Sequence, residues 1–348
     1  MTSDIFTLAD LGWSAHFMQQ LELEEFETLI PARLSAVQRS TATAMHPGGE
    51  AQVLVPSDQS TGDYAIGDWV VLNPDLLRIE RRLDRLSLLE RRAAGTDVKT
   101  QLMAANVNTL FVVSSCNDDF NPARLERYLA LAAQSDIQPV MVLTKADLVE
   151  NPDTYADQAR ALSRDLPVLT VDARSEAGVA KLFDWWPKQQ TAILLGSSGV
   201  GKSTLVNSLT GADQDTGGIR EDDAKGRHTT TERSLHRSEH GGWLIDTPGL
   251  RALRLHSAAD GIDSVFAEVS ELAATCRFSD CTHAGEPGCA VGAAIKSGEL
   301  DPERLDRWQK LRAEDDRNSE TLEQSRKRAK RFGKVVKEAM SERKRRGK

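Results

Sequence analysis

A glycine-rich segment that could hold phosphate follows the short apolar run at positions 192–195. It reads Gly-Ser-Ser-Gly-Val-Gly-Lys-Ser, which matches G-x-x-x-x-G-K-[ST], and a helical pattern comes after it. In such a P-loop the backbone amides surround phosphates at a helix N-terminus, the lysine neutralises the β and γ phosphates, and the serine hydroxyl can bind Mg²⁺. The alternative is a chance glycine turn before a helix. The predicted nucleotide-binding residues are Gly196, Ser197, Ser198, Gly199, Val200, Gly201, Lys202, Ser203 and Thr204.

A second motif with phosphate chemistry, Asp-Thr-Pro-Gly, begins at Asp246 after the apolar run 243–245. An aspartate at a strand end can reach Mg²⁺, and the amide of Gly249 can sense the γ-phosphate. Residues 211–232, between the two motifs, lack apolar periodicity, and a loop of that length is usually functional. It contains Gly-Arg-His-Thr-Thr-Thr, so one of the threonines 229–231 could close on Mg²⁺ and order the loop as a switch. The catalytic candidates are Lys202, Asp246, Gly249, His228 and Thr230, and the predicted Mg²⁺ ligands are Ser203 and Asp246.

A third motif indicates that the base is guanine. Thr144, Lys145, Ala146 and Asp147 follow the apolar run 140–143 and resemble the signature [NT]-K-x-D. The aspartate can accept hydrogen bonds from N1–H and the 2-amino group of guanine, which adenine lacks, and the lysine stem can lie along the base. Threonine stands where asparagine is commoner, which leaves open the additional contact toward the base and the P-loop. An exposed strand-to-helix turn is the alternative explanation of the motif.

The order of the motifs differs from that of ordinary GTPases. There the P-loop comes first and the guanine motif last, whereas here the guanine motif at 144 precedes the P-loop at 196, and D-x-x-G at 246 comes last. We therefore predict a circularly permuted domain. The segment after Gly249, normally internal, leads directly into the C-terminal part of the chain, so a switch movement would pull on whatever follows.

Three of the four cysteines fall within fourteen residues, together with one histidine. Three thiolates and one imidazole make a closed tetrahedral set for Zn²⁺ with no position for water, which is typical of a structural site. Free buried thiols or a redox pair are the alternatives, and Cys116, alone on an apolar run, is predicted to lie in the core. The predicted zinc ligands are Cys276, Cys281, His283 and Cys289.

Together the permuted guanine motifs, G-R-H-T-T, D-T-P-G and C-x4-C-x-H-x5-C resemble the ribosome small-subunit-dependent GTPase A family (RsgA, also called YjeQ or YloQ). The resemblance covers about residues 30–330. It implies an OB domain, a permuted GTPase domain and a zinc domain, with GTP hydrolysis activated by the small ribosomal subunit late in its assembly. Leu250 replaces the glutamine that ordinary GTPases carry after D-x-x-G, as in the family.

The sequence patterns of the helices and strands that must position these residues predict a multidomain α/β protein. Short β-prone pieces broken by glycine turns suit an OB-type β-barrel, and later apolar runs with helical patterns between them suit parallel strands. We expect a circularly permuted P-loop GTPase domain and a C-terminal zinc-binding α-helical domain to follow the barrel. The predicted divisions are an N-terminal extension (1–31), the barrel (32–98), the GTPase domain (99–255), the zinc-binding domain (256–325) and a basic tail (326–348).

Charge is distributed unevenly along the 348 residues, whose net charge is −8. Residues 326–348 hold twelve Lys or Arg and two Glu, so the remainder is strongly acidic. A basic tail on an acidic body suggests contact with a polyanion, although a solvated helix end is the alternative. No apolar run approaches the roughly 20 residues that cross a bilayer, and the start lacks the features of a secretory signal, so we expect a cytoplasmic, soluble protein with no membrane partner.

The motifs predict a Mg²⁺-dependent GTP hydrolase that binds GTP and GDP and contacts small-subunit ribosomal RNA through its barrel, zinc module and tail, as a monomer. With Leu250 unable to orient water, His228 is a candidate for that task, the ribosome could supply the group instead, and a histidine without a catalytic role is a further alternative. A free-standing P-loop kinase or ATPase, and an RNA-binding module with a vestigial nucleotide fold, are the rival hypotheses.

Overall fold

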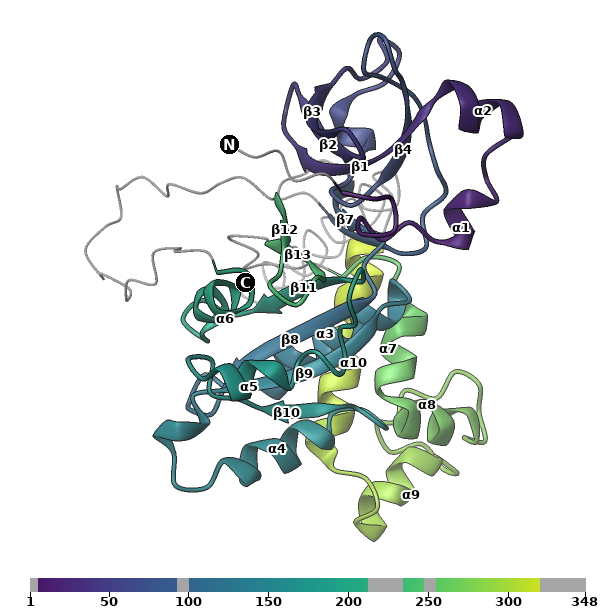
Figure 1. Cartoon of the computed structure of the whole chain (residues 1–348). Coiled ribbons are helices and arrows are strands. Elements are labelled where there is room, and N and C mark those ends of the chain that lie inside the picture. Colours follow the sequence, from purple (N-terminus) through teal and green to yellow (C-terminus); the bar gives the residue numbers. More distant parts are fainter. Residues whose placement is uncertain (1–5, 93–99, 212–233, 247–254, 320–348) are drawn as a thin grey trace, which may run out of the picture.

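The computed structural model describes residues 6–92, 100–211, 234–246 and 255–319 (Figure 1). His228, Thr230, Gly249, Leu250 and the predicted tail 326–348 lie outside these ranges. Within them, no helix is both long and apolar enough to cross a bilayer.

The N-terminal β domain is a closed five-stranded barrel. Its antiparallel sheet has the order β3-β2-β1-β4-β5, and a parallel bridge from Leu54 to Arg78 joins the two edge strands. Two backbone hydrogen bonds make this closure, from the Leu54 amide to Leu77 O at 3.0 Å and from the Ile79 amide to Leu54 O at 2.9 Å. One parallel closure in an otherwise antiparallel five-stranded barrel is the arrangement of an OB fold, as predicted. The strands are β1 (Ile30–Val37), β2 (Ala42–His46), β3 (Gly49–Val53), β4 (Trp69–Asn73) and β5 (Arg78–Arg82).

Short elements surround the barrel. Helices α1 (Ala15–Met18) and α2 (Leu23–Thr28) precede it, and the one-turn helix η1 (Thr61–Asp63) lies between β3 and β4. A hairpin of β6 (Leu88–Arg92) and β7 (Thr100–Ala105) connects the barrel to the following sheet, and Ala104 of this hairpin bridges Ile66 beside the barrel.

The central sheet has six strands in the order β10-β9-β8-β11-β13-β12, all parallel except β12. The guanine-side strands β8 to β10 come before the P-loop strand β11 in the chain, and β12 and β13 come after it, which confirms the predicted circular permutation. The strands are β8 (Thr109–Ser115), β9 (Gln138–Thr144), β10 (Val168–Thr170), β11 (Thr191–Gly196), β12 (Ser234–Arg237) and β13 (Trp243–Asp246).

Alternate residues of these strands supply two separate cores. Leu110, Val112 and Ile193 point to a core shared with α3 (Pro122–Gln134), α4 (Pro152–Arg160) and α7 (Ala259–Val265). Phe111, Val113 and Leu194 point to the opposite core, shared with α5 (Glu176–Ala180) and α6 (Lys202–Thr210). Both faces of the sheet are therefore covered, which explains the continuous apolar runs in the sequence.

A helical region comes last in the described part of the chain. It contains α7, α8 (Ala267–Ala274), α9 (Ala290–Ser297) and α10 (Pro302–Ser319), and it lies beside α3 (Figure 1). The buried carboxylate of Glu126 in α3 joins the two parts, since it accepts hydrogen bonds from Arg304 at 2.7 Å and Arg307 at 2.9 Å in α10. The predicted C-terminal helical region is thus confirmed for the described residues.

Candidate functional site

The P-loop lies between β11 and α6, at the carboxyl end of the parallel strands, where α/β sheets commonly bind ligands. Two glycines are required by its path. A Cβ on Gly196 would lie 2.2 Å from the carbonyl oxygen of Val113 in β8, and Gly201 has φ +93°, a conformation that favours glycine. The backbone therefore turns closely enough to place amide groups at the start of α6.

Two side chains that follow the loop, Lys202 and Ser203, could act on a nucleotide. The Lys202 ammonium donates to the carbonyl of Gly196 at 2.9 Å and to that of Ser197, so it folds back across the loop. In this position it can neutralise the β and γ phosphates of a nucleotide. Ser203 lies exposed in the first turn of α6, where its hydroxyl is available to Mg²⁺.

The guanine motif is attached directly to the P-loop. The buried Thr144 hydroxyl lies 2.6 Å from Val200 O, and the Lys145 ammonium donates to Gly199 O at 2.8 Å. Threonine thus makes the P-loop contact that the sequence left open. Lys145 has a left-handed φ of 57°, which starts the one-turn helix η2 (Ala146–Leu148) carrying the exposed Asp147. The loops that would hold base and phosphates are therefore neighbours.

A third loop joins them from β10. Val171, Asp172 and Ala173 follow this strand, and the Val171 amide donates to Leu143 O at 2.9 Å. From α6, the Ser208 hydroxyl donates to Ala173 O at 2.8 Å. The helix that begins at the P-loop therefore also holds the loop that follows β10.

Asp246 completes the described part of the phosphate side. It ends β13, next to the P-loop strand, with Ile193 of β11 opposite Ile245. Its side chain is half-buried at the same edge of the sheet as the P-loop. The remaining candidates, His228, Thr230 and Gly249, belong to segments outside the described residues.

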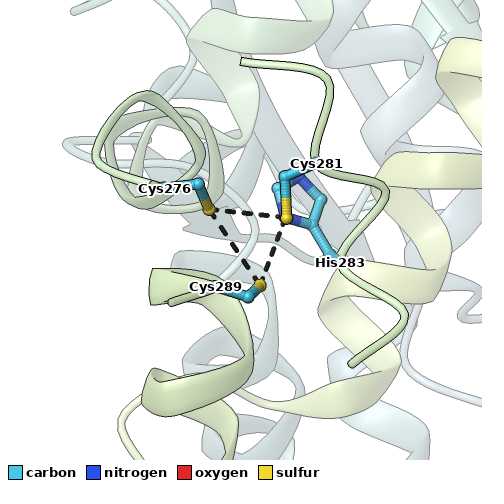
Figure 2. A group of neighbouring side chains, drawn as sticks. All are labelled: Cys276, Cys281, His283 and Cys289. Atoms are coloured by element: carbon cyan, nitrogen blue, oxygen red, sulfur yellow. Dashed lines mark hydrogen bonds between the residues drawn. The ribbon is translucent and has the colours of Figure 1, made fainter. Parts of the chain in front are cut away.

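The three cysteines and the histidine meet in the C-terminal region (Figure 2). Cys276 follows α8, Cys289 precedes α9, and Cys281 and His283 come from the loop between these helices. The Cys289 sulfur also accepts a hydrogen bond from the Gly292 amide at 3.2 Å, which caps α9. Folding of the two helices therefore brings residues from both sides of the loop together.

The spacing of the ligand atoms fits a tetrahedral ion. Cys276 Sγ and Cys289 Sγ are 4.0 Å apart, and His283 Nδ1 lies 3.7 Å from the first and 3.5 Å from the second. A tetrahedron with Zn–S of about 2.3 Å and Zn–N of about 2.0 Å has edges of about 3.5 to 3.8 Å. All four ligand atoms lie within 4.8 Å of one another, so the cluster can hold a divalent ion with no change of fold.

The thiols influence one another's ionisation. Burial raises the pKa of Cys276, but the backbone amides of Val291 and Ala290 and the neighbouring thiols outweigh it, so the pKa lies below its ordinary value. For Cys281, the hydrogen bond from the His283 amide lowers the pKa, but burial and the other two thiols together have the larger effect and raise it to about 11. A bound cation would stabilise all the thiolates together. The remaining cysteine, Cys116, is buried in the core as predicted.

Known proteins resemble this chain over most of its length. The model of the RsgA GTPase family matches residues 82–256. The chain is 52% identical over 323 residues to the "Small ribosomal subunit biogenesis GTPase RsgA" of Mesorhizobium japonicum, which covers 92% of this chain and 93% of that relative. This chain belongs to the RsgA GTPase family. A second member, "Small ribosomal subunit biogenesis GTPase RsgA 2" of Vibrio parahaemolyticus, is 46% identical over 340 residues, or 97% of this chain and 94% of the relative.

Two solved structures share the RsgA fold. YloQ, described as a circularly permuted GTPase, superposes with a TM-score of 0.59 over 86% of this chain and all of its own. YjeQ from Thermotoga maritima superposes with a TM-score of 0.58 over 81% of this chain and 97% of its own. Both are 22% identical in sequence, so these likenesses concern the fold. Membership of the RsgA family makes the chain a GTPase.

Of two polar contacts in the RsgA nucleotide site, sequence reasoning missed the one from Ser208 and left the one from Thr144 open. The hydroxyl of Ser208 had no motif to mark it, since a serine on a helix is common. The contact from Thr144 to the P-loop could have been expected from the signature itself, because the hydroxyl at that position can reach a backbone carbonyl across the sheet edge.

Proposed function

We propose that this chain is a Mg²⁺-dependent GTPase that acts in the biogenesis of the small ribosomal subunit and is stimulated by it. The observation that supports this most is the direct attachment of the guanine motif to the P-loop through Thr144 and Lys145, in a chain 52% identical to a small ribosomal subunit biogenesis GTPase. A free-standing P-loop kinase or ATPase would not need the guanine motif in this position.

In the proposed site each residue has one task. Asp147 accepts from the two guanine donors, and Lys202 stabilises charge on the phosphates. Ser203, Asp246 and a threonine of 229–231, represented by Thr230, hold Mg²⁺, while the amide of Gly249 senses the γ-phosphate. The backbone amides of residues 196–204 enclose the phosphates, beside Thr144, Lys145 and Ala146. When bound, Mg²⁺ offsets the negative charge of the phosphates during hydrolysis.

We propose that Cys276, Cys281, His283 and Cys289 bind one structural zinc ion per chain. Few apolar side chains lie in the loop 277–288, so ligation would hold its two halves together. The domain divisions predicted from the sequence are kept in this proposal, with barrel, zinc module and basic tail contacting ribosomal RNA in the cytoplasm, and the protein acting as a monomer.

The test is GTP turnover by the purified protein alone, with small ribosomal subunits, and with large subunits as the control. We expect slow turnover alone and strong acceleration by small subunits only. Equal competition by ATP would contradict guanine selection, and a rate unchanged by small subunits would contradict the proposed partner.

A further inference from the structure

The N-terminal residues 6–17, here called the strap, connect the barrel to the GTPase sheet. On the sheet side the strap contacts Trp243, the first residue of β13. The indole N–H of Trp243 donates to Asp10 O at 2.7 Å, and the Phe6 ring meets the indole edge-on with centroids 5.7 Å apart. The guanidinium of Arg237 in β12 lies 5.3 Å from the centre of the Phe6 ring. The strap therefore holds both strands of the β12–β13 hairpin.

On the barrel side the strap packs on Trp69 of β4. The Trp13 ring meets Trp69 with centroids 4.8 Å apart, and Phe17 lies against the same indole at 5.5 Å. Leu11 and Phe17 are buried, at 0% and 2% exposure. Because both side chains are removed from water, the strap is firmly seated on the barrel.

A buried arginine of the barrel links the strap to the P-loop strand. Arg33 of β1 is 1% exposed, and its guanidinium donates to Leu11 O at 2.8 Å and to the Thr191 hydroxyl at 2.5 Å. Thr191 is the first residue of β11. Gly12 of the strap is equally constrained, because a Cβ there would lie 2.6 Å from Gln189 O. The strap, the barrel and the amino ends of β11 and β13 are thus connected by close contacts.

The carboxyl ends of the same two strands carry the phosphate chemistry. Asp246 ends β13 three residues after Trp243, a distance of about 10 Å along an extended strand. Gly196 ends β11, which starts at Thr191. A strand hydrogen-bonded on both sides moves as a unit, so a shift at its amino end changes the position of its carboxyl end.

We propose that the strap conveys the binding of a partner at the barrel to Asp246, with Trp243 as the positioning residue. The proposal rests on the proposed function, in which the small subunit is that partner. The barrel touches the sheet directly as well, because β1 packs against β12, but the strap adds the contact to β13. When the partner moves the barrel, the strap moves β13 through its contacts with Trp243, and this movement changes the position of the Asp246 carboxylate.

The test compares two buried tryptophans. Trp243→Phe keeps an aromatic ring but removes the N–H that donates to Asp10 O. Trp186→Phe is the matched control, because its indole is also fully buried and donates to a carbonyl, Gln190 O at 2.9 Å, but packs in the opposite core of the sheet from Trp243. Gln190 O also accepts from the Trp243 backbone amide, which every variant keeps. Phe6→Ala is a second variant, which removes the half-buried ring that joins the strap to Trp243 and Arg237. Each protein is assayed for GTP turnover with and without small subunits and for co-sedimentation with them.

We expect Trp243→Phe and Phe6→Ala to lower the ratio of stimulated to unstimulated turnover by about 5-fold or more, the size of a typical coupling between sites, while still binding the subunits. Trp186→Phe should keep the wild-type ratio. Three results overturn the inference: both strap variants stimulated like the wild type, a loss of stimulation matched by an equal loss of subunit binding, or the same loss in Trp186→Phe. A wild-type protein that is not stimulated at all refutes the proposed function itself.

Discussion

The ionic contact between α3 and α10 allows a quantitative prediction. Glu126 is fully buried and accepts from Arg304 at 2.7 Å and from Arg307 at 2.9 and 3.1 Å. Breaking a buried ion pair by removing one partner costs about 3 to 5 kcal/mol, because a charge is left without compensation. In Glu126→Ala, however, Arg304 keeps the Glu268 carboxylate at 2.6 Å and the carbonyls of Leu162 and Val265. We therefore expect a loss near the lower limit, about 3 kcal/mol.

The assay must report locally, because a multidomain chain need not unfold in one step. Native-state hydrogen exchange gives the free energy of opening at each contact, from the amides of α3 and α10 for Glu126 and from those of α4 for the control pair. Asp157→Ala is the control, since Asp157 and Arg160 form an ion pair of similar length, 2.6 Å, with side chains 76% and 55% exposed. Exposed pairs contribute about 0 to 1 kcal/mol, so this variant should change little. If both variants lower the opening free energy equally, the argument from burial is wrong.

Three further predictions concern separate parts of the molecule. Cys281→Ala should lose stoichiometric zinc and melt at a lower temperature, and a variant with unchanged zinc content and melting profile would contradict a structural zinc site. Hydrogen bonding to Arg81 lowers the pKa of Glu25 to about 2 from its ordinary 4.5, so this contact stabilises the fold above about pH 4.5 and its contribution is lost as the pH falls toward 2. Melting temperatures between pH 6 and 3 should therefore decline less steeply in Glu25→Gln than in the wild type, and parallel curves would refute this. His228→Ala should bind GTP but lose most of its acceleration by small subunits; if the acceleration is retained, the group that positions water comes from elsewhere.

The parallel strands could be predicted because both of their faces are buried. Val140 to Leu143 and Ala192 to Leu195 are continuous apolar runs, and each became a central strand of the sheet. β1 and β12 could not be predicted in the same way. β1 includes the buried Arg33, whose partner Thr191 is 158 residues away, and β12 is a four-residue edge strand of mixed polarity.

The parts of the candidate site that could be predicted from the sequence are those whose residues lie close together along the chain. The P-loop, the guanine motif and the metal cluster are each encoded within about fifteen residues, so their patterns are visible without a structure. Contacts between segments are different: Glu126 and Arg304 are 178 residues apart, and no local pattern marks either as buried. The strap has no motif either, because its role depends on Trp69 and Trp243, which belong to two different sheets.

The most direct test of the central claim changes the nucleobase of the ligand and residue 147 of the protein together. Asp147→Asn replaces an acceptor by an amide that can also donate, and xanthine carries an oxygen where guanine carries its 2-amino group. The variant should bind GDP about 10-fold or more weakly, from the loss of one charge-assisted hydrogen bond worth about 1.5 to 3 kcal/mol, and should favour xanthosine diphosphate. Small subunits should then stimulate hydrolysis of xanthosine triphosphate by Asp147→Asn and of GTP by the wild type. If Asp147→Asn still prefers guanine nucleotides, or if subunits stimulate neither reaction, the account of a guanine-specific, subunit-stimulated site is contradicted.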